Sequence, residues 1–139
     1  MTWLAALLTA AFTAIAAIHA YWGLGGLWPA RSAADLARAV IGDGRTRMPS
    51  RWACFAVALL LLIVAAWPWA MLAHPDSQLL LVVGIVAAAI FFVRGSAGYS
   101  PRWRARFSAE PFATWDMQLY SPLCMILATG LMALLAKGM

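Results

Sequence analysis

A few polar and aromatic side chains interrupt the long apolar segments of this chain, and their types are those that bind a ligand or transfer a proton. They are His19, Tyr21, Trp22, Arg94, Asp116, Tyr120 and Cys124. His19 lies inside an otherwise uncharged segment. An ionisable group in such a segment usually faces the interior of a helix bundle or a cavity. Its imidazole could transfer a proton or bind a metal. The alternative is a neutral histidine that hydrogen-bonds a neighbouring helix through Tyr120 or Asp116.

Arg94 and Asp116 carry opposite charges and adjoin two successive apolar segments, at the same expected membrane depth. An ion pair between them would set the register of two helices, and the guanidinium could also orient an anionic head group. The simpler alternative is that Arg94 extends along its apolar stem to the membrane surface.

No cofactor is predicted. Cys54, Cys124 and His19 are soft ligands that a metal could share, but they are dispersed and the sequence has no Cys-x-x-Cys pair. His74 is expected near the opposite membrane face from His19, so we do not expect bis-histidine haem ligation. Both cysteines are expected on the reducing side of the membrane, where a disulfide does not persist.

Composition indicates that membrane helices position these residues. Of 139 residues, 65% are hydrophobic and 11% charged, which is too apolar for a soluble domain of this size. The same hydrophobicity excludes a disordered chain, and two cysteines are too few for a disulfide scaffold. The net charge of +5 comes from scattered residues rather than a clustered basic face, so nucleic-acid binding is not expected.

Four segments are long and apolar enough to cross ~30 Å of hydrocarbon, or nearly so. They cover residues 2–22, 52–73, 75–93 and 115–136 of a single membrane domain, residues 1–139. We therefore predict an all-α polytopic membrane protein, a four-transmembrane-helix bundle. The third helix is long enough only if Pro75 starts it. The fourth is short if Ser121 caps it, so we favour a start at Thr114–Trp115 and a kink at Pro122.

The positive charges indicate the orientation of the chain. Nine of the ten Lys and Arg residues lie in residues 31–51 and 94–106, the two long loops on one side. The positive-inside rule places these loops in the cytoplasm and both termini outside. Within the loops, Ser32 is expected to cap a short helix that ends before Gly42. Trp103 and Phe107 are expected to share one face of a second, interfacial helix.

Several sequence motifs together resemble a known family. One run, His19 to Pro29, contains the pattern His-x-Tyr-Trp-x-x-Gly-Gly, and another reads Tyr120-Ser121-Pro122-Leu123-Cys124. With Val93-Arg94-Gly95 and Glu110-Pro111-Phe112, they resemble the signature of small bacterial four-helix membrane proteins classed as a domain of unknown function. The resemblance covers most of the chain. It implies a multi-pass bacterial inner-membrane protein and supplies no activity or cofactor.

Three functions fit these observations, in the following order of preference. The first is binding of a lipid-like or small apolar ligand in a pocket that opens to the cytoplasmic leaflet, with the seven residues named first as polar and aromatic anchors. The second is a structural subunit that assembles with another copy or with another membrane protein, among membrane lipids. The third is an enzyme with His19 as general base and Tyr120 or Asp116 as acid. The site hypotheses require His19, Arg94, Asp116 and Tyr120 to converge in the fold.

Overall fold

The computed structural model describes residues 1–138, which form helices and no strand, so the all-α prediction is confirmed. In chain order the elements are α1 (Thr2–Gly23), α2 (Ala33–Val40), α3 (Arg51–Ala73), α4 (Gln78–Ala97), α5 (Pro101–Arg106), α6 (Phe112–Trp115), the π-helical turn η1 (Asp116–Tyr120) and α7 (Ser121–Gly138). Four helical segments are long and apolar enough to cross a membrane: α1, α3, α4 and the continuous stretch Phe112–Lys137. This is the architecture of a multi-pass membrane protein with four spans.

The third span differs from its predicted bounds at both ends. The helix begins at Gln78 rather than Pro75, because the Ser77 hydroxyl caps it by accepting a hydrogen bond from the Leu80 N–H. Its length is recovered at the other end, where it continues to Ala97. Arg94 therefore lies within the last turn of the helix rather than after it.

The fourth span is the longer helix through Pro122, as favoured from the sequence, but it starts earlier, at Phe112. Thr114 does not cap it; its N–H and hydroxyl donate to the Glu110 carboxylate instead. A π-helical turn precedes Pro122, and the Ser121 N–H donates to the Asp116 carbonyl five residues back. A proline inside an α-helix lacks its N–H and its ring crowds the preceding turn, and a wider turn accommodates both effects.

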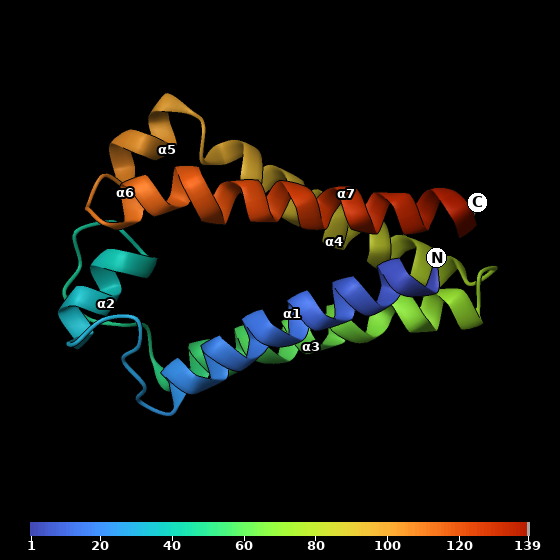
Figure 1. Ribbon diagram of the computed structural model, residues 1–139, viewed down its shortest axis with the longest axis horizontal. Coiled ribbons are helices and arrows are strands. Elements are labelled where there is room, and N and C mark those ends of the chain that lie inside the picture. The colour runs from blue at the N-terminus through green and yellow to red at the C-terminus, as the bar shows by residue number, and fades with distance from the viewer. Residues whose placement is uncertain (139) are drawn as a thin grey trace.

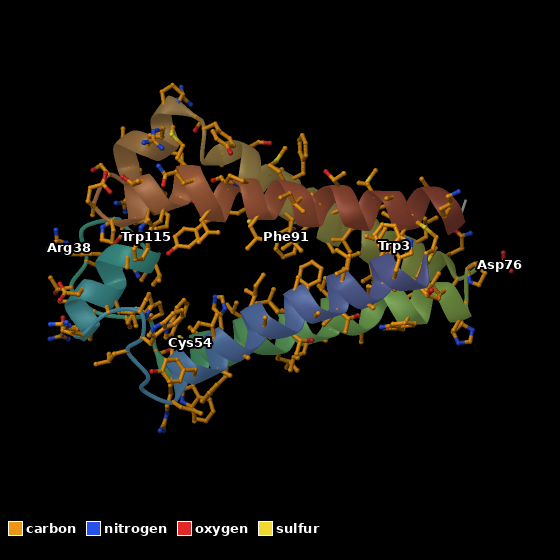
Figure 2. All side chains as sticks on the ribbon, viewed as in Figure 1. Trp3, Arg38, Cys54, Asp76, Phe91 and Trp115 are labelled. Carbon is orange, nitrogen blue, oxygen red and sulfur yellow. The ribbon has the colours of Figure 1, made fainter. Side chains whose placement is uncertain are left out.

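The four spans form two antiparallel pairs, α1 with α3 and α4 with α7 (Figure 1). The pairs converge at the end that carries both termini and diverge toward α2. Figure 2 shows Trp3 and Asp76 at the converging end, and Arg38 and Trp115 at the other. The two loops that hold most of the arginines, between α1 and α3 and between α4 and α7, therefore lie at the diverging end. We call this end the loop side.

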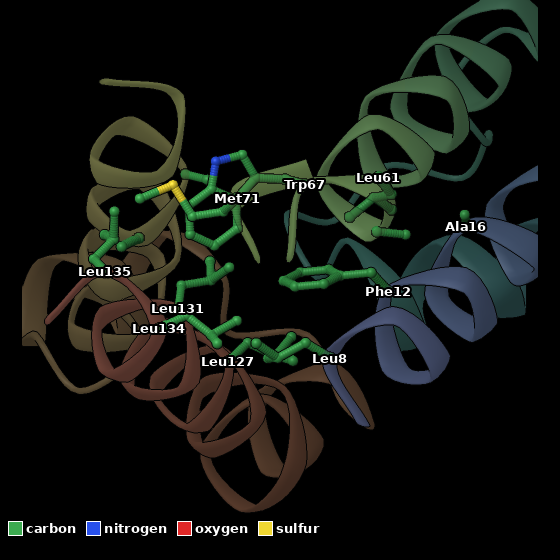
Figure 3. Packing of buried hydrophobic residues seen from close by; sticks show 13 residues of the cluster. Leu8, Phe12, Ala16, Leu61, Trp67, Met71, Leu127, Leu131, Leu134 and Leu135 are labelled. Atoms are coloured by element: carbon green, nitrogen blue, oxygen red, sulfur yellow. The ribbon is translucent and has the colours of Figure 1, made fainter. Parts of the chain in front are cut away.

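The buried core joins the two pairs where they converge (Figure 3). The rings of Phe12 in α1 and Phe91 in α4 lie 5.1 Å apart. Gly130 of α7 lets Leu8 approach so closely that a Cβ on the glycine would stand 2.8 Å from a Leu8 methyl carbon. Small residues at such contacts are how membrane helices pack without a hydrophobic driving force.

Both loop helices form as expected. The Ser32 hydroxyl caps α2 by accepting from the Asp35 N–H, and Gly42 follows the helix with a φ of 78°. In α5 and its C-cap, the Trp103 and Phe107 rings share one face with their centroids 4.2 Å apart.

Candidate functional site

Asp116 and Arg94 form an ion pair at the loop side of the α4–α7 pair. An Arg94 terminal nitrogen lies 2.6 Å from Asp116 Oδ1. The Asp116 side chain is 2% exposed and that of Arg94 is 29% exposed. Burial makes the pairing necessary, because an unpaired carboxylate at this position would be strongly destabilising.

Two further donors complete the coordination of this carboxylate. The Trp103 indole N–H of α5 donates to Asp116 Oδ2 over 2.9 Å. The Ser121 hydroxyl donates to Oδ1 over 3.2 Å and is itself fully buried. The Arg94 guanidinium also lies over the Trp103 ring, 4.6 Å from its centroid. Both oxygens of Asp116 are thus occupied, and α4, α5 and α7 meet at one carboxylate.

Trp103 and Ser121 were not recognised as partners of Asp116 from the sequence. The sequence predicts that Trp103 is an interfacial aromatic residue and that Ser121 is a helix cap before Pro122. In a regular α-helix, residues five apart point in different directions. The π-helical turn closes hydrogen bonds from residue i to i+5, and it therefore brings Ser121 over Asp116.

Glycine provides the space for this arrangement. A Cβ on Gly98, the residue that ends α4 as its C-cap, would collide with the Ser121 hydroxyl oxygen and would stand 3.0 Å from Asp116 Oδ2. A Cβ on Gly95, one turn earlier, would stand 3.0 Å from the Ser121 carbonyl oxygen. The two glycines that follow Arg94 in the sequence mark where another helix approaches closely. Their partners lie on that other helix, so the sequence alone does not identify them.

Tyr120 anchors α2 to the second helix pair. Its hydroxyl donates to the Ala39 carbonyl over 3.0 Å, and its ring packs 5.6 Å from the Phe112 ring. The Ala109 N–H also donates to the Gly42 carbonyl. The loop between α1 and α3 is thereby attached to the loop side of the α4–α7 pair.

His19 does not join Arg94 and Asp116. Its Nδ1 lies 2.7 Å from the carbonyl oxygen of Ile15, one turn back in α1. Its ring packs edge-on against Trp22 at a centroid distance of 5.1 Å. The partners suggested for it from the sequence, Tyr120 and Asp116, are bonded to other groups.

Tyr21 and Trp22 shape the turn after α1. The Trp22 indole N–H donates to the Trp28 carbonyl over 2.8 Å, and the Trp28 N–H donates to the Tyr21 hydroxyl over 3.3 Å. A Cβ on Gly26 would overlap the Tyr21 ring. The His-x-Tyr-Trp-x-x-Gly-Gly pattern thus describes a glycine-containing turn closed by two aromatic side chains.

The inward-facing stripe of α1 leads directly to His19. Ala5, Leu8, Phe12 and Ala16 are buried at spacings of three and four residues, and His19 is the next position on that face. His19 is only half-buried, however, and none of residues 17–22 is buried.

The inward-facing stripe of α7 also becomes less buried toward the loop side. Cys124 precedes the buried Leu127, Ala128 and Leu131 by three, four and seven residues, so it lies on the same face of the helix. Cys124 is half-buried, as is Tyr120 one turn earlier. Between residues 117 and 126, only Ser121 is buried.

Mutual burial of the two pairs therefore ends near Ala16 and Leu127, while their inward faces continue toward the loop side. We call the half-buried residues His19, Tyr120 and Cys124 the loop-side face. Within residues 1–138, no group of three or more His, Cys, Asp or Glu side chains could hold a metal ion. Hence Cys54, Cys124 and His19 do not form the three-ligand set considered from the sequence.

A model of a family described as protein of unknown function (DUF3995) matches residues 12–131. The chain belongs to this family. The match includes every residue of the loop-side face and the Arg94–Asp116 pair. No curated protein and no solved structure matches the chain.

The seven residues singled out from the sequence thus divide into three groups. Arg94 and Asp116 form an ion pair whose carboxylate is buried, Tyr21 and Trp22 close a turn, and the remaining three make up the loop-side face. The single cluster expected from the sequence is not formed, because the two helix pairs separate His19 from the ion pair.

Proposed function

We propose that this protein binds a lipid-like amphiphile against its loop-side face, between the two helix pairs. One observation carries the proposal: the inward stripes of α1 and α7 continue past the point where the pairs bury each other. Inward surface that the neighbouring helices cover only in part is suited to an acyl or isoprenoid chain.

The composition of the face supports an amphiphile rather than a purely apolar ligand. His19, Tyr120 and Cys124 each bring a polar atom to a half-buried position among apolar neighbours such as Ile18 and Leu123. Apolar walls with a few polar anchors are the usual construction of small-molecule sites.

Catalysis is supported less well. The Asp116 carboxylate accepts from Arg94, Trp103 and Ser121, and its side chain is 2% exposed, so no oxygen of it is directed at a substrate. The Tyr120 hydroxyl donates its hydrogen bond to the Ala39 carbonyl oxygen. The geometry of this site therefore provides no general acid to act together with His19 as general base.

The orientation of the protein in the membrane decides which leaflet supplies the ligand. We propose that the loop side faces the cytoplasm of a bacterial inner membrane, because nine of ten basic residues belong to residues 31–51 and 94–106. The ligand would then occupy the cytoplasmic leaflet.

Native mass spectrometry of the full chain, released from mild detergent, tests the proposal. Cys124→Trp should fill the loop-side face and remove a co-purified amphiphile that the wild type retains. Thr129→Trp is the matched control, because Thr129 lies on the same helix at an exposed position. A wild type without bound amphiphile, or equal retention in both variants, would rule the proposal out.

A further inference from the structure

We infer that Arg51 binds the phosphate of an anionic phospholipid whose acyl chains lie along the outer face of α3. The site is separate from the loop-side face, so the inference goes beyond the proposed function. The observation behind it is an exposed guanidinium held over an exposed aromatic ring, at the point where the lipid-facing surface of a span begins.

The outer face of α3 is an apolar surface that starts at Trp52. Trp52, Ala56, Leu59 and Ile63 are all exposed, at spacings of four, three and four residues, so they share one face of the helix. The Trp52 side chain, the largest of them, is 67% exposed. Because α3 is long and apolar enough to cross a membrane, we expect lipid acyl chains to contact this face.

Trp52 holds Arg51 at the end of this apolar surface. The guanidinium carbon of Arg51 lies 5.0 Å from the centroid of the Trp52 ring, a cation–π contact. The Trp52 ring packs edge-on against Phe55, with their centroids 6.0 Å apart. Phe55 packs on the end of α1, where a Cβ on Gly23 would stand 2.7 Å from its ring. The α1–α3 contact thus positions the ring beneath the guanidinium before any lipid binds, which lowers the cost of binding.

The guanidinium of Arg51 has the hydrogen-bond donors to bind a phosphate. Neither of the two ion pairs among residues 1–138 includes Arg51. A cation–π contact uses none of the N–H donors of an arginine. A guanidinium can form two parallel hydrogen bonds with a phosphate, which the ammonium of lysine cannot do. An anion that meets Arg51 therefore finds a free and oriented partner.

Depth and charge both favour a phospholipid with a net negative charge. Arg51 is the first residue of α3, so its guanidinium lies where the span reaches the membrane surface and the lipid phosphates. The loop side also carries nine of the ten basic residues, in residues 31–51 and 94–106. A positive surface attracts phosphatidylglycerol, whereas the choline of phosphatidylcholine already neutralises its phosphate.

A matched pair of phospholipids tests the inference. Phosphatidylglycerol and phosphatidylcholine with identical acyl chains share the phosphate and differ in net charge. Each is titrated into the delipidated full chain in mild detergent, and bound lipid is measured by native mass spectrometry. We expect the wild type to prefer phosphatidylglycerol. Arg51→Gln should lower this preference about fivefold, the contribution of one arginine at an anionic surface.

Arg47→Gln is the matched control. Arg47 is also exposed and belongs to neither ion pair, so its substitution removes the same charge. It lies four residues before α3, however, and takes part in no cation–π contact among residues 1–138. Arg51→Lys should keep part of the preference, and Trp52→Leu should lower it although the charge remains. Thermal unfolding identifies any variant that fails to fold; if Arg51→Gln does, Trp52→Leu decides the question.

Two results would overturn the inference outright. One is equal binding of the two lipids by the wild type, and the other is an equal loss in Arg51→Gln and Arg47→Gln, which would indicate a general attraction rather than a site. Inorganic phosphate at the same concentration should not compete, because it has no acyl chain to contact α3. Competition by it would overturn the assignment to a lipid.

Cys124→Trp separates this inference from the proposed function. Cys124 belongs to the loop-side face, so filling that face should leave the phosphatidylglycerol preference unchanged. Loss of the preference in Cys124→Trp would overturn the site at Arg51. Retention of the preference in a protein that binds no amphiphile at the loop-side face would support the inference and contradict only the proposed function.

Discussion

The carboxylate of Asp116 and the guanidinium of Arg94 are 2.6 Å apart at their closest atoms, although 22 residues separate them in the chain. The same carboxylate accepts a hydrogen bond from the indole N–H of Trp103, which belongs to a third element, α5. A single buried charge thus connects the end of α4, the interfacial helix α5 and the start of the last span. This contact joins the two helices of the pair at the loop side.

Removing one partner of the ion pair should be strongly destabilising. Asp116→Ala leaves the Arg94 charge, the Trp103 indole and the Ser121 hydroxyl without their acceptor, and we expect a loss of about 2–4 kcal/mol in the free energy of unfolding. Thermal or denaturant unfolding in mild detergent measures it. The double variant Arg94→Met/Asp116→Leu, which removes both charges, should be more stable than Asp116→Ala. Asp76→Asn, at an exposed turn, should have no effect.

An added methyl group at Gly98 should disrupt the same contact sterically. In Gly98→Ala, the new Cβ would meet the buried Ser121 hydroxyl, so the helices must move apart, at a cost of about 1–3 kcal/mol. Ser96→Ala, two residues away at an exposed position, is the control. Equal melting temperatures for the two variants would contradict the close approach of α4 and α7.

Tyr120→Phe should loosen α2 without disturbing the spans. The substitution keeps the ring against Phe112 and removes the hydrogen bond to the Ala39 carbonyl, worth about 1 kcal/mol. Hydrogen exchange should accelerate in residues 33–42 and remain unchanged in α3. If exchange in α2 is unaffected, Tyr120 does not anchor that helix.

The orientation predicts which positions can be labelled from outside. In a Cys54→Ser/Cys124→Ser background, Asp76→Cys should react with a membrane-impermeant maleimide in intact cells. Thr46→Cys should react only after lysis, because the positive-inside rule places residues 31–51 in the cytoplasm. Both positions are exposed, so accessibility within the protein does not limit labelling. The reverse pattern would move the proposed ligand to the outer leaflet.

The sequence by itself determined the architecture of the spans. Long apolar runs must be helical in a membrane, since every backbone polar group needs a partner there, and this local rule located four spans within a few residues. The serine cap at Ser32 acts on an N–H three residues away, so a local signal sufficed to predict it. The predicted start at Pro75 was wrong, because the helix begins at Gln78, where the Ser77 hydroxyl caps it by accepting from the Leu80 N–H.

Only the tertiary structure decided which polar residues meet. Residues on one regular helix keep a spacing of three or four, but the π-helical turn at Asp116–Tyr120 shifts Ser121 onto Asp116 and is not encoded in that spacing. The separation of His19 from Arg94 depends on how far the helix pairs diverge from their core. That core is built by side chains distant in sequence, such as Phe12 and Phe91, and packing between such residues depends on the shapes of both partners at once.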